Sequence, residues 1–156
     1  MKAYLLETFR FNDEANKKMI EKIKTLTMQE DAVRHMSHLI NSQDKWMARI
    51  SMYPQKPYMD WWLPVYPLDS LAHEWRRSVN AWIQYLEKVD EAALHEDAHF
   101  IGYDDKHWST PLKDIALQLN YHSIHHRAQV QLFIRNQGVE PDFIDYIGTK
   151  YTKHEH

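Results

Sequence analysis

Glycine is scarce in this sequence, and its scarcity restricts the fold more than any other single feature. Only 3 of the 156 residues are glycine. A fold rich in tight turns needs glycine wherever the backbone takes up positive φ, whereas long helices do not. We therefore predict an all-α protein made of long helices with few connections.

The first third of the chain contains two stretches whose apolar residues recur every three or four positions, as on one face of a helix. The first covers about 2–26. A capping box at Thr27-Met28-Gln29-Glu30 predicts the start of the second, which continues to about residue 51.

Two further helices are expected later in the chain. One begins at Asp69 as its cap and continues for about twenty residues with apolar residues at helical spacing. The other is capped by Ser109 or Thr110, carries Pro111 in its first turn and ends at Gly138. These are favoured places for a proline and a glycine.

Two of the connections are long. Residues 52–67 hold four prolines and five aromatic residues, which predicts an ordered crossover between the second and third helices. Residues 92–108 are expected to form a short hairpin or loop, around Tyr103-Asp104-Asp105-Lys106, before the fourth helix. Four helices with one or two long crossings are typical of a helix bundle, and the length fits a single domain over 1–156.

Composition excludes several classes of protein. The chain has no cysteine, which rules out disulfides, thiolate zinc sites and a cysteine nucleophile. The formal net charge is −3 without a long basic run, so no nucleic-acid partner is expected. Two prolines break the apolar segment 61–68, which is too short to span a membrane. The apolar run near the N-terminus is too short to be the apolar region of a signal peptide. We expect a soluble, cytoplasmic protein with no membrane partner.

The stretch HEDAHFIGYDD (95–105) contains His-Glu-x-x-His, the zinc-protease signature in which two histidines hold the metal and the glutamate is the base. That role requires a helix through 95–99, but the residues that follow are turn-prone. Long-motif metalloproteases also place a methionine turn downstream, and no methionine lies after position 59. A zinc metalloprotease is therefore only a minor alternative, and a solvated connection rich in histidine is favoured.

A second His-x-x-x-His pair lies in LNYHSIHHRAQ (119–129), on the expected apolar face of the fourth helix. Side chains four residues apart project from the same side of a helix, so His122 and His126 can bind one ion. Alternatively, each donates a hydrogen bond to a carbonyl or carboxylate inside the bundle. With 11 histidines in the chain, about one accidental pair of this spacing is expected, so the spacing leaves both alternatives open.

A metal site needs a third ligand from another helix. His35 and His38 on the second helix are candidates, and His73 on the third is a weaker one. A di-iron carboxylate centre is disfavoured, because it needs Glu-x-x-His on each of two helices and the sequence has this pattern only at Glu96 and His99. Three histidines without a carboxylate leave an open position on the ion, which is the arrangement of catalytic sites.

The sequence resembles the DinB family, also called DinB/YfiT-like, over nearly its whole length. The segment HLINSQDKW (38–46) is similar to the family's His-(Ile/Leu)-Leu-Asn-Ala-Glu…Trp segment. The segment NYHSIHHRAQVQLFIRNQGVEPDFID (120–145) is similar to its His-x-x-x-His-Arg-Gly-Gln stretch with the Leu-Arg-x-x-Gly and Pro-x-x-Asp that follow. Two positions depart from the pattern, since Ala128 stands where glycine is usual and Gln43 where an acidic residue is frequent.

The resemblance implies that His38, His122 and His126 are the metal ligands, with zinc or nickel as the usual divalent ion. It also implies a four-helix bundle in up-down-down-up order and commonly a homodimer. Characterised members of this DNA-damage-inducible group include thiol-dependent transferases and isomerases.

These features lead to a main functional hypothesis, a variant and a rival. Because the chain has no thiol of its own, a low-molecular-weight thiol cosubstrate would be activated on the ion and transferred to a small-molecule substrate. A related hydrolase would activate water and need a general base, for which Tyr121, Asp44 and Glu30 are candidates. The rival is a non-enzymatic, stress-related protein whose metal only stabilises the fold or a dimer.

Two other groups of residues have alternative roles. Arg127 and Gln129 flank the ligand face and could hold an anionic substrate, but ordinary hydrogen bonds between helices are favoured for both. The aromatic residues Trp61, Trp62 and Tyr66 could form a lid over the site or cover a dimer interface, and the sequence leaves these alternatives open.

Overall fold

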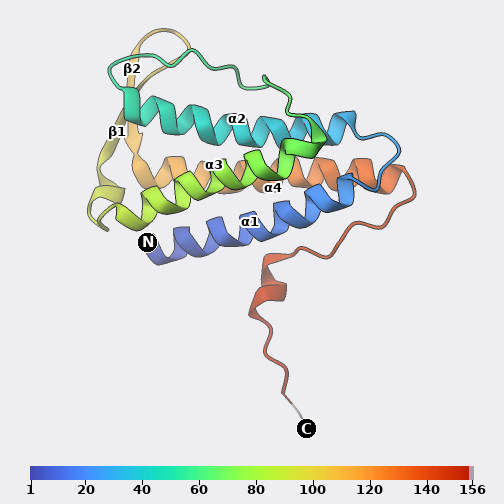
Figure 1. The fold of residues 1–156 in the computed structure, drawn as a ribbon. Helices are drawn as coiled ribbons and strands as arrows, with labels where there is room; N and C mark the ends of the chain where they lie inside the picture. Colours follow the sequence, from blue (N-terminus) through green and yellow to red (C-terminus); the bar gives the residue numbers. More distant parts are fainter. Residues whose placement is uncertain (155–156) are drawn as a thin grey trace.

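Long helices make up most of the computed structural model, which describes residues 1–154 (Figure 1). They are α1 (Lys2–Ile23), α2 (Glu30–Met52), α3 (Leu68–Lys88) and α4 (Leu112–Asn136). The remaining elements are the strands β1 (Asp97–Ile101) and β2 (His107–Pro111) and the short 3-10 helices η1 (Ala93–His95) and η2 (Tyr146–Lys150). Within these residues the fold is mostly helical, which agrees with the predicted all-α class except for one small two-stranded sheet.

The crossover between α2 and α3 follows from the directions of the helices. In Figure 1, α1 and α4 run from left to right, whereas α2 and α3 run from right to left. Because α2 and α3 point the same way, residues 53–67 must return along the bundle before α3 can start. Both α1 and α2 pack against α3 and against α4.

The core lies between the helices and contains two tryptophans from α3. Trp82 stacks on Phe9 of α1 at 6.0 Å between ring centroids, and Trp75 donates its indole N–H to Oδ1 of Asp13 at 3.0 Å. Both indoles are almost fully buried. Other fully buried side chains come from every long helix: Leu5, Ile20, Met36, Ile40, Leu71, Leu86, Ile115 and Ile134.

The end of α1 and the start of α2 differ from the prediction. The first helix ends at Ile23 and not near residue 26, although Leu26 still packs into the core. The capping box at Thr27 is not formed, because Gln29 is the N-cap and has no side-chain capping bond. Glu30 instead accepts the backbone N–H of the adjacent Gln29 at 3.0 Å.

The starts of the other two helices also differ. Pro67 is the N-cap of α3, so Asp69 lies in the first turn, where a carboxylate favours the positive end of the helix dipole. Ser109 and Thr110 do not cap α4, because both lie in β2 and Pro111 is the N-cap. The predicted end of α4 is correct, since Gly138 has a φ of 73° directly after Gln137, the C-cap.

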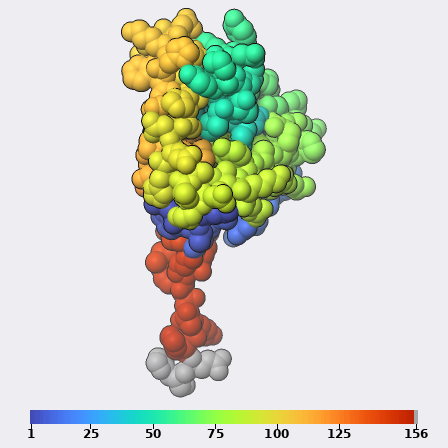
Figure 2. All heavy atoms as spheres, turned by 90° about the vertical axis from the view of Figure 1, so that its left-hand side faces the viewer, coloured from blue at the N-terminus to red at the C-terminus, as the bar shows by residue number. Residues whose placement is uncertain are grey.

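The predicted hairpin before α4 is confirmed. Strand β1 pairs with β2 antiparallel, from Asp97 opposite Pro111 to Ile101 opposite His107. Phe100 packs edge-on against Trp46 of α2 at 5.0 Å between ring centroids. Figure 2 views this end of the molecule and shows the hairpin region beside the end of α2 and the start of the crossover. None of the helices within residues 1–154 combines the length and apolar character that a membrane span requires.

Candidate metal centre

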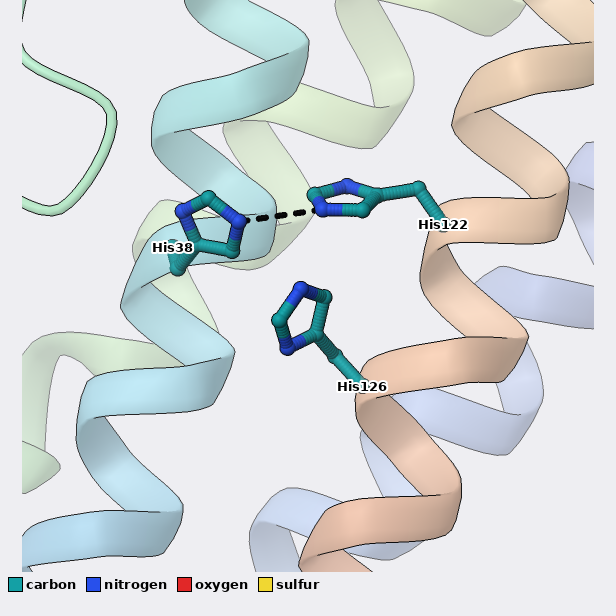
Figure 3. Close-up of side chains that lie close together, drawn as sticks. All are labelled: His38, His122 and His126. Atoms are coloured by element: carbon teal, nitrogen blue, oxygen red, sulfur yellow. Dashed lines mark hydrogen bonds between the residues drawn. The ribbon is translucent and has the colours of Figure 1, made fainter.

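Three histidines that are distant in sequence meet between α2 and α4. His38 comes from α2, and His122 and His126 come from consecutive turns of α4 (Figure 3). One ring nitrogen of each lies within 4.8 Å of the other two. Nε2 of His38 is 3.0 Å from Nε2 of His122. The three residues that the resemblance implied as ligands are therefore together in the fold.

The spacing and chemistry of these side chains suit a single divalent ion. Imidazole nitrogens bind zinc at about 2.0–2.1 Å, so two ligands of a tetrahedral ion lie about 3.3 Å apart. The 3.0 Å between the Nε2 atoms of His38 and His122 is close to that value. Within residues 1–154 no carboxylate belongs to the group, so a bound ion would keep an open coordination position.

His38 is held in the orientation that ligation needs. Its Nδ1–H donates a hydrogen bond to the backbone carbonyl of Trp61 at 2.7 Å, so the lone pair lies on Nε2, which faces His122. The indole of Trp62 stacks on the His38 ring, with 3.8 Å between centroids and 11° between planes. These two contacts fix the tautomer and the ring plane of His38.

His126 has another histidine as its outer neighbour. Nδ1 of His126 lies 2.7 Å from Nδ1 of His35, so a proton on one of these nitrogens joins the two rings. This leaves Nε2 of His126 for an ion, and Figure 3 shows a nitrogen of that ring directed toward the other two rings. His35, one of the candidates for the third ligand, therefore supports His126 and is not a member of the group of three.

Burial lowers the pKa of each histidine in this cluster. Desolvation is the main cause and neighbouring imidazoles add to it, which brings the pKa of His122 to about 4 and that of His126 to about 3. The pKa of His38 is also lowered, mainly by burial, although its hydrogen bond to the Trp61 carbonyl opposes the shift. The three rings are therefore neutral at pH 7, which is the form that binds a metal.

Two hydrogen bonds join the crossover to α2, one from a residue on each side of His38 in the helix. Asn41 donates its side-chain N–H to the carbonyl of Pro64 at 3.0 Å, and Ser37 accepts the backbone N–H of Tyr66 at 3.0 Å. Asn41 and Ser37 are both buried. The contacts hold residues 61–66 against the helix that carries His38.

A local turn places the two tryptophans of the crossover over the site. Oδ1 of Asp60 accepts the backbone N–H groups of Trp62 at 2.6 Å and Leu63 at 2.9 Å. The carbonyl of Trp61 and the ring of Trp62 both contact His38. Of the two alternatives for these aromatic residues, the contacts support a lid over the histidines.

A cleft of about 380 Å³ opens beside the histidines. His38 and His122 line it, so an ion held there would face this space. Along α2 the lining continues with Ser42 and Arg49, about one and three helical turns beyond His38. The other lining residues are Trp46, Trp61, Gln118 and Leu119. A cleft of this size fits a small molecule.

Arg49 and Ser42 were not among the predicted site residues, although the sequence contains a signal for them. Positions 38, 42, 45 and 49 recur at intervals of four, three and four residues, so they follow His38 along one helical face. Their role was not evident because a polar stripe of this kind is also typical of a solvent-exposed helix face.

Comparison with known proteins settles the family. A profile of the DinB superfamily matches residues 32–130, which is more than half of the chain and includes all three histidines of the cluster. The chain belongs to the DinB superfamily. No curated protein matches the chain, and no solved structure matches it either.

The protease hypothesis is wrong for this DinB protein. His95 ends η1 and His99 lies in β1, so no helix runs through 95–99 to bring the two imidazoles onto one ion. Pairing with β2 holds this segment extended, and the ring of His99 lies 5.5 Å from that of Tyr53. His73, the weaker candidate for a third ligand, is exposed on α3 and is not part of the histidine group.

Arg127 and Gln129 do not line the cleft of this DinB protein. Nη1 of Arg127 donates to Oδ1 of Asn12 at 2.9 Å and of Asn16 at 3.1 Å, so Arg127 joins α4 to α1 as favoured from the sequence. Gln129 instead pairs within α4, where its Nε2 is 3.0 Å from Nε2 of His125.

The three candidate bases lie outside the cleft as well. Asp44 accepts hydrogen bonds from Arg77 and Ser78 of α3, and Glu30 accepts a backbone N–H at the start of α2. Tyr121 is 63% exposed and borders a different hollow, between α1 and α4. Within residues 1–154, no carboxylate lines the cleft beside the histidines.

Proposed function

We propose that this DinB protein is a metal-dependent enzyme that transfers a small thiol to a small electrophile. His38, His122 and His126 would hold one divalent ion, zinc or nickel, at the edge of the cleft. The observation that carries the proposal is the convergence of three neutral imidazoles beside a cleft of about 380 Å³.

The thiol must come from outside, because the chain has no cysteine. When bound, the ion supplies Lewis acidity that lowers the pKa of a thiol or a water at its open position. The thiol loses its proton to solvent, its sulfur forms a bond to an electrophilic carbon, and the leaving group departs with the electron pair of the bond that breaks. The chain contributes neutral imidazoles and a tryptophan lid that limits the access of water.

Thiol transfer is favoured over hydrolysis because, in the part of the chain that the structure describes, the cleft offers no carboxylate as a base. A thiol has an ordinary pKa of about 8.5 and ionises far more readily than water, with a pKa of about 15.7. Within residues 1–154 no carboxylate lines the cleft to assist a water molecule. A hydrolase therefore remains the variant and not the main proposal.

Metal content tests the ligand set. Wild-type and His126→Ala proteins are loaded with zinc or nickel and analysed by inductively coupled plasma mass spectrometry. We expect about one ion per chain in the wild type and its loss in His126→Ala, because two imidazoles bind an ion much less tightly than three. The control, His99→Ala, changes a histidine of β1 and should keep its ion. No ion in the wild type, or loss only in His99→Ala, would contradict the proposal.

Activity is tested on the metal-loaded protein. Thiol consumption is measured with glutathione-like, bacillithiol-like and mycothiol-like donors and standard electrophiles. In parallel, the absorption spectrum of the cobalt-substituted protein is recorded with each thiol. Consumption together with a spectral change supports the enzyme, whereas a silent spectrum and no consumption favour the non-enzymatic, stress-related alternative.

Two expectations of the resemblance belong to this proposal. One is the up-down-down-up order of the helices, which the helix directions in Figure 1 support. The other is a homodimer, which is consistent with the exposed apolar side chains of Ile124 and Leu132 on α4.

A further inference from the structure

Arg49 is buried in the wall of the cleft, with no acidic partner among residues 1–154. The residue is 7% exposed. The guanidinium carbon lies over three aromatic rings, 4.8 Å from the centroid of Trp46, 4.9 Å from Trp61 and 5.3 Å from Phe100. Within residues 1–154 it takes part in no ion pair or hydrogen bond, in contrast to Arg77, which pairs with Asp44.

A buried cation of this kind is costly unless something compensates it. The faces of aromatic rings stabilise a guanidinium, but no group within residues 1–154 accepts from its five N–H donors, which are left to the solvent of the cleft. Burial also lowers the pKa of Arg49, which shows the same penalty on its charged form. Because the guanidinium lines the cleft, a ligand that enters the cleft can supply the missing acceptors.

The surroundings of Arg49 favour an anion. Lys45, one turn earlier on α2, lies 4.2 Å from the ring centroid of Trp61 and adds a second positive charge. Ser42, between the histidine and the arginine on the same helical face, has a buried Oγ without a hydrogen-bond partner in residues 1–154. Asp60 interacts with Lys45, but its Oδ1 already accepts two backbone N–H groups.

We propose that Arg49 binds the carboxylate of a small molecule whose reactive end lies at the histidines. Arg49 lies eleven positions after His38 on α2, about 16 Å along the helix axis. Both side chains tilt toward the N-terminus, but that of Arg49 is the longer one, so the arginine covers part of that distance. The cleft therefore suits a thiol or an electrophile that carries its carboxylate several bonds from the reacting atom. The identity of the reactive end rests on the proposed function, whereas carboxylate binding at Arg49 does not.

Three full-length variants are compared with the wild type. Arg49→Lys keeps the charge but loses the planar guanidinium, and Arg49→Met removes the charge but keeps an unbranched side chain that packs against the rings. Arg76→Met is the matched control, because it removes an exposed arginine from α3 with the same change in net charge. Circular dichroism establishes that each variant is folded.

The first measurement compares a charged with a neutral thiol on cobalt-loaded protein. The absorption spectrum is titrated with 6-mercaptohexanoate and with 6-mercaptohexanol. We expect the wild type and Arg76→Met to bind the acid at least about tenfold more tightly than the alcohol, as a charge-assisted bidentate bond would provide. Arg49→Met should bind the two within about twofold of each other, and Arg49→Lys should lie between. An acid preference that persists in Arg49→Met overturns the proposal.

The second measurement needs neither metal nor thiol. Metal-free, ¹⁵N-labelled protein is titrated with hexanoate, and the Nε–Hε signal of Arg49 is identified by its absence from the Arg49→Lys spectrum. We expect this signal to shift and saturate, and a signal that does not move overturns the proposal. If no thiol binds the cobalt-loaded protein but hexanoate moves this signal, the proposed reaction fails while the anion site stands.

Discussion

Neighbouring side chains decide what each of two buried arginines does. Arg127 donates to Asn12 and Asn16, so its hydrogen-bonding capacity serves the contact between α1 and α4. Burial nevertheless lowers its pKa to about 10. Arg49 is almost as deeply buried but has aromatic rings around it and a cleft in front of it. The first arginine therefore has a structural role, and the second is available to a ligand.

The buried imidazoles should make the stability of the metal-free protein depend on pH. The pKa of His122 is lowered to about 4 and that of His126 to about 3, so both stay neutral in the folded protein at pH 5. In the unfolded chain they take up protons below about pH 6.5. Unfolding then binds protons, so the free energy of unfolding should fall as the pH drops from 6.5 toward 4.

Urea denaturation with a chelator present, at pH 7, 6 and 5, measures this dependence. In the His122→Gln/His126→Gln double variant, unfolding at pH 5 should take up about two fewer protons than in the wild type, which appears as a shallower fall of stability with decreasing pH. His73→Gln, which changes an exposed histidine on α3, should follow the wild type. Parallel curves for the wild type and the double variant would refute the buried, neutral state of these rings.

At the scale of elements, α2 and the crossover form the site together. One face of α2 carries His38, Ser42 and Arg49 into the cleft, while Met36 and Ile40 from the same helix are fully buried in the core. The crossover passes over the end of this face that carries His38, because it must connect two helices that run in the same direction. The topology of the bundle thus supplies the lid.

The lid should contribute to metal binding through Trp62. Replacement of Trp62 by alanine removes the ring that stacks on His38 at 3.8 Å, so the imidazole gains freedom that it must lose again when it binds an ion. We expect the zinc affinity to fall about tenfold, as for other groups that orient a ligating histidine. Competition with a chromophoric chelator measures the affinity.

Tyr58→Ala provides the control for this prediction. Tyr58 belongs to the same crossover but is fully exposed, so its removal should leave the zinc affinity unchanged. If Trp62→Ala and Tyr58→Ala bind zinc equally tightly, the crossover is a connection only and does not support the histidines.

At the scale of the whole molecule, Trp82 connects three helices. From α3 it stacks on Phe9 of α1 and donates its indole N–H to the carbonyl of Gln43 in α2 at 2.9 Å. Because the side chain is fully buried, Trp82→Ala should lower the free energy of unfolding by about 3–5 kcal/mol. Urea denaturation of Trp108→Ala, which changes a half-exposed residue of β2, should show a loss below about 1 kcal/mol. Similar losses in the two variants would contradict this account of the core.

Local patterns in the sequence predicted the helices and the long connections, because amphipathic periodicity and the turn preferences of glycine and proline depend on nearby residues only. The end of α4 just before Gly138 is an example. The predicted caps failed because a cap also depends on the backbone conformation that neighbouring elements impose. Ser109 and Thr110, for example, pair with β1 and cannot cap α4.

The sequence by itself determined that His122 and His126 share a helical face, since their spacing is that of one helical turn. The residues alone left His35, His38 and His73 open as partners, and the resemblance pointed to His38. Only the tertiary structure decided that His38 faces the pair, that Trp62 covers it and that Arg49 lies among aromatic rings in the wall of the cleft. These facts depend on how α2, α4 and the crossover pack together. Contacts between residues more than twenty positions apart leave no local periodicity in a sequence.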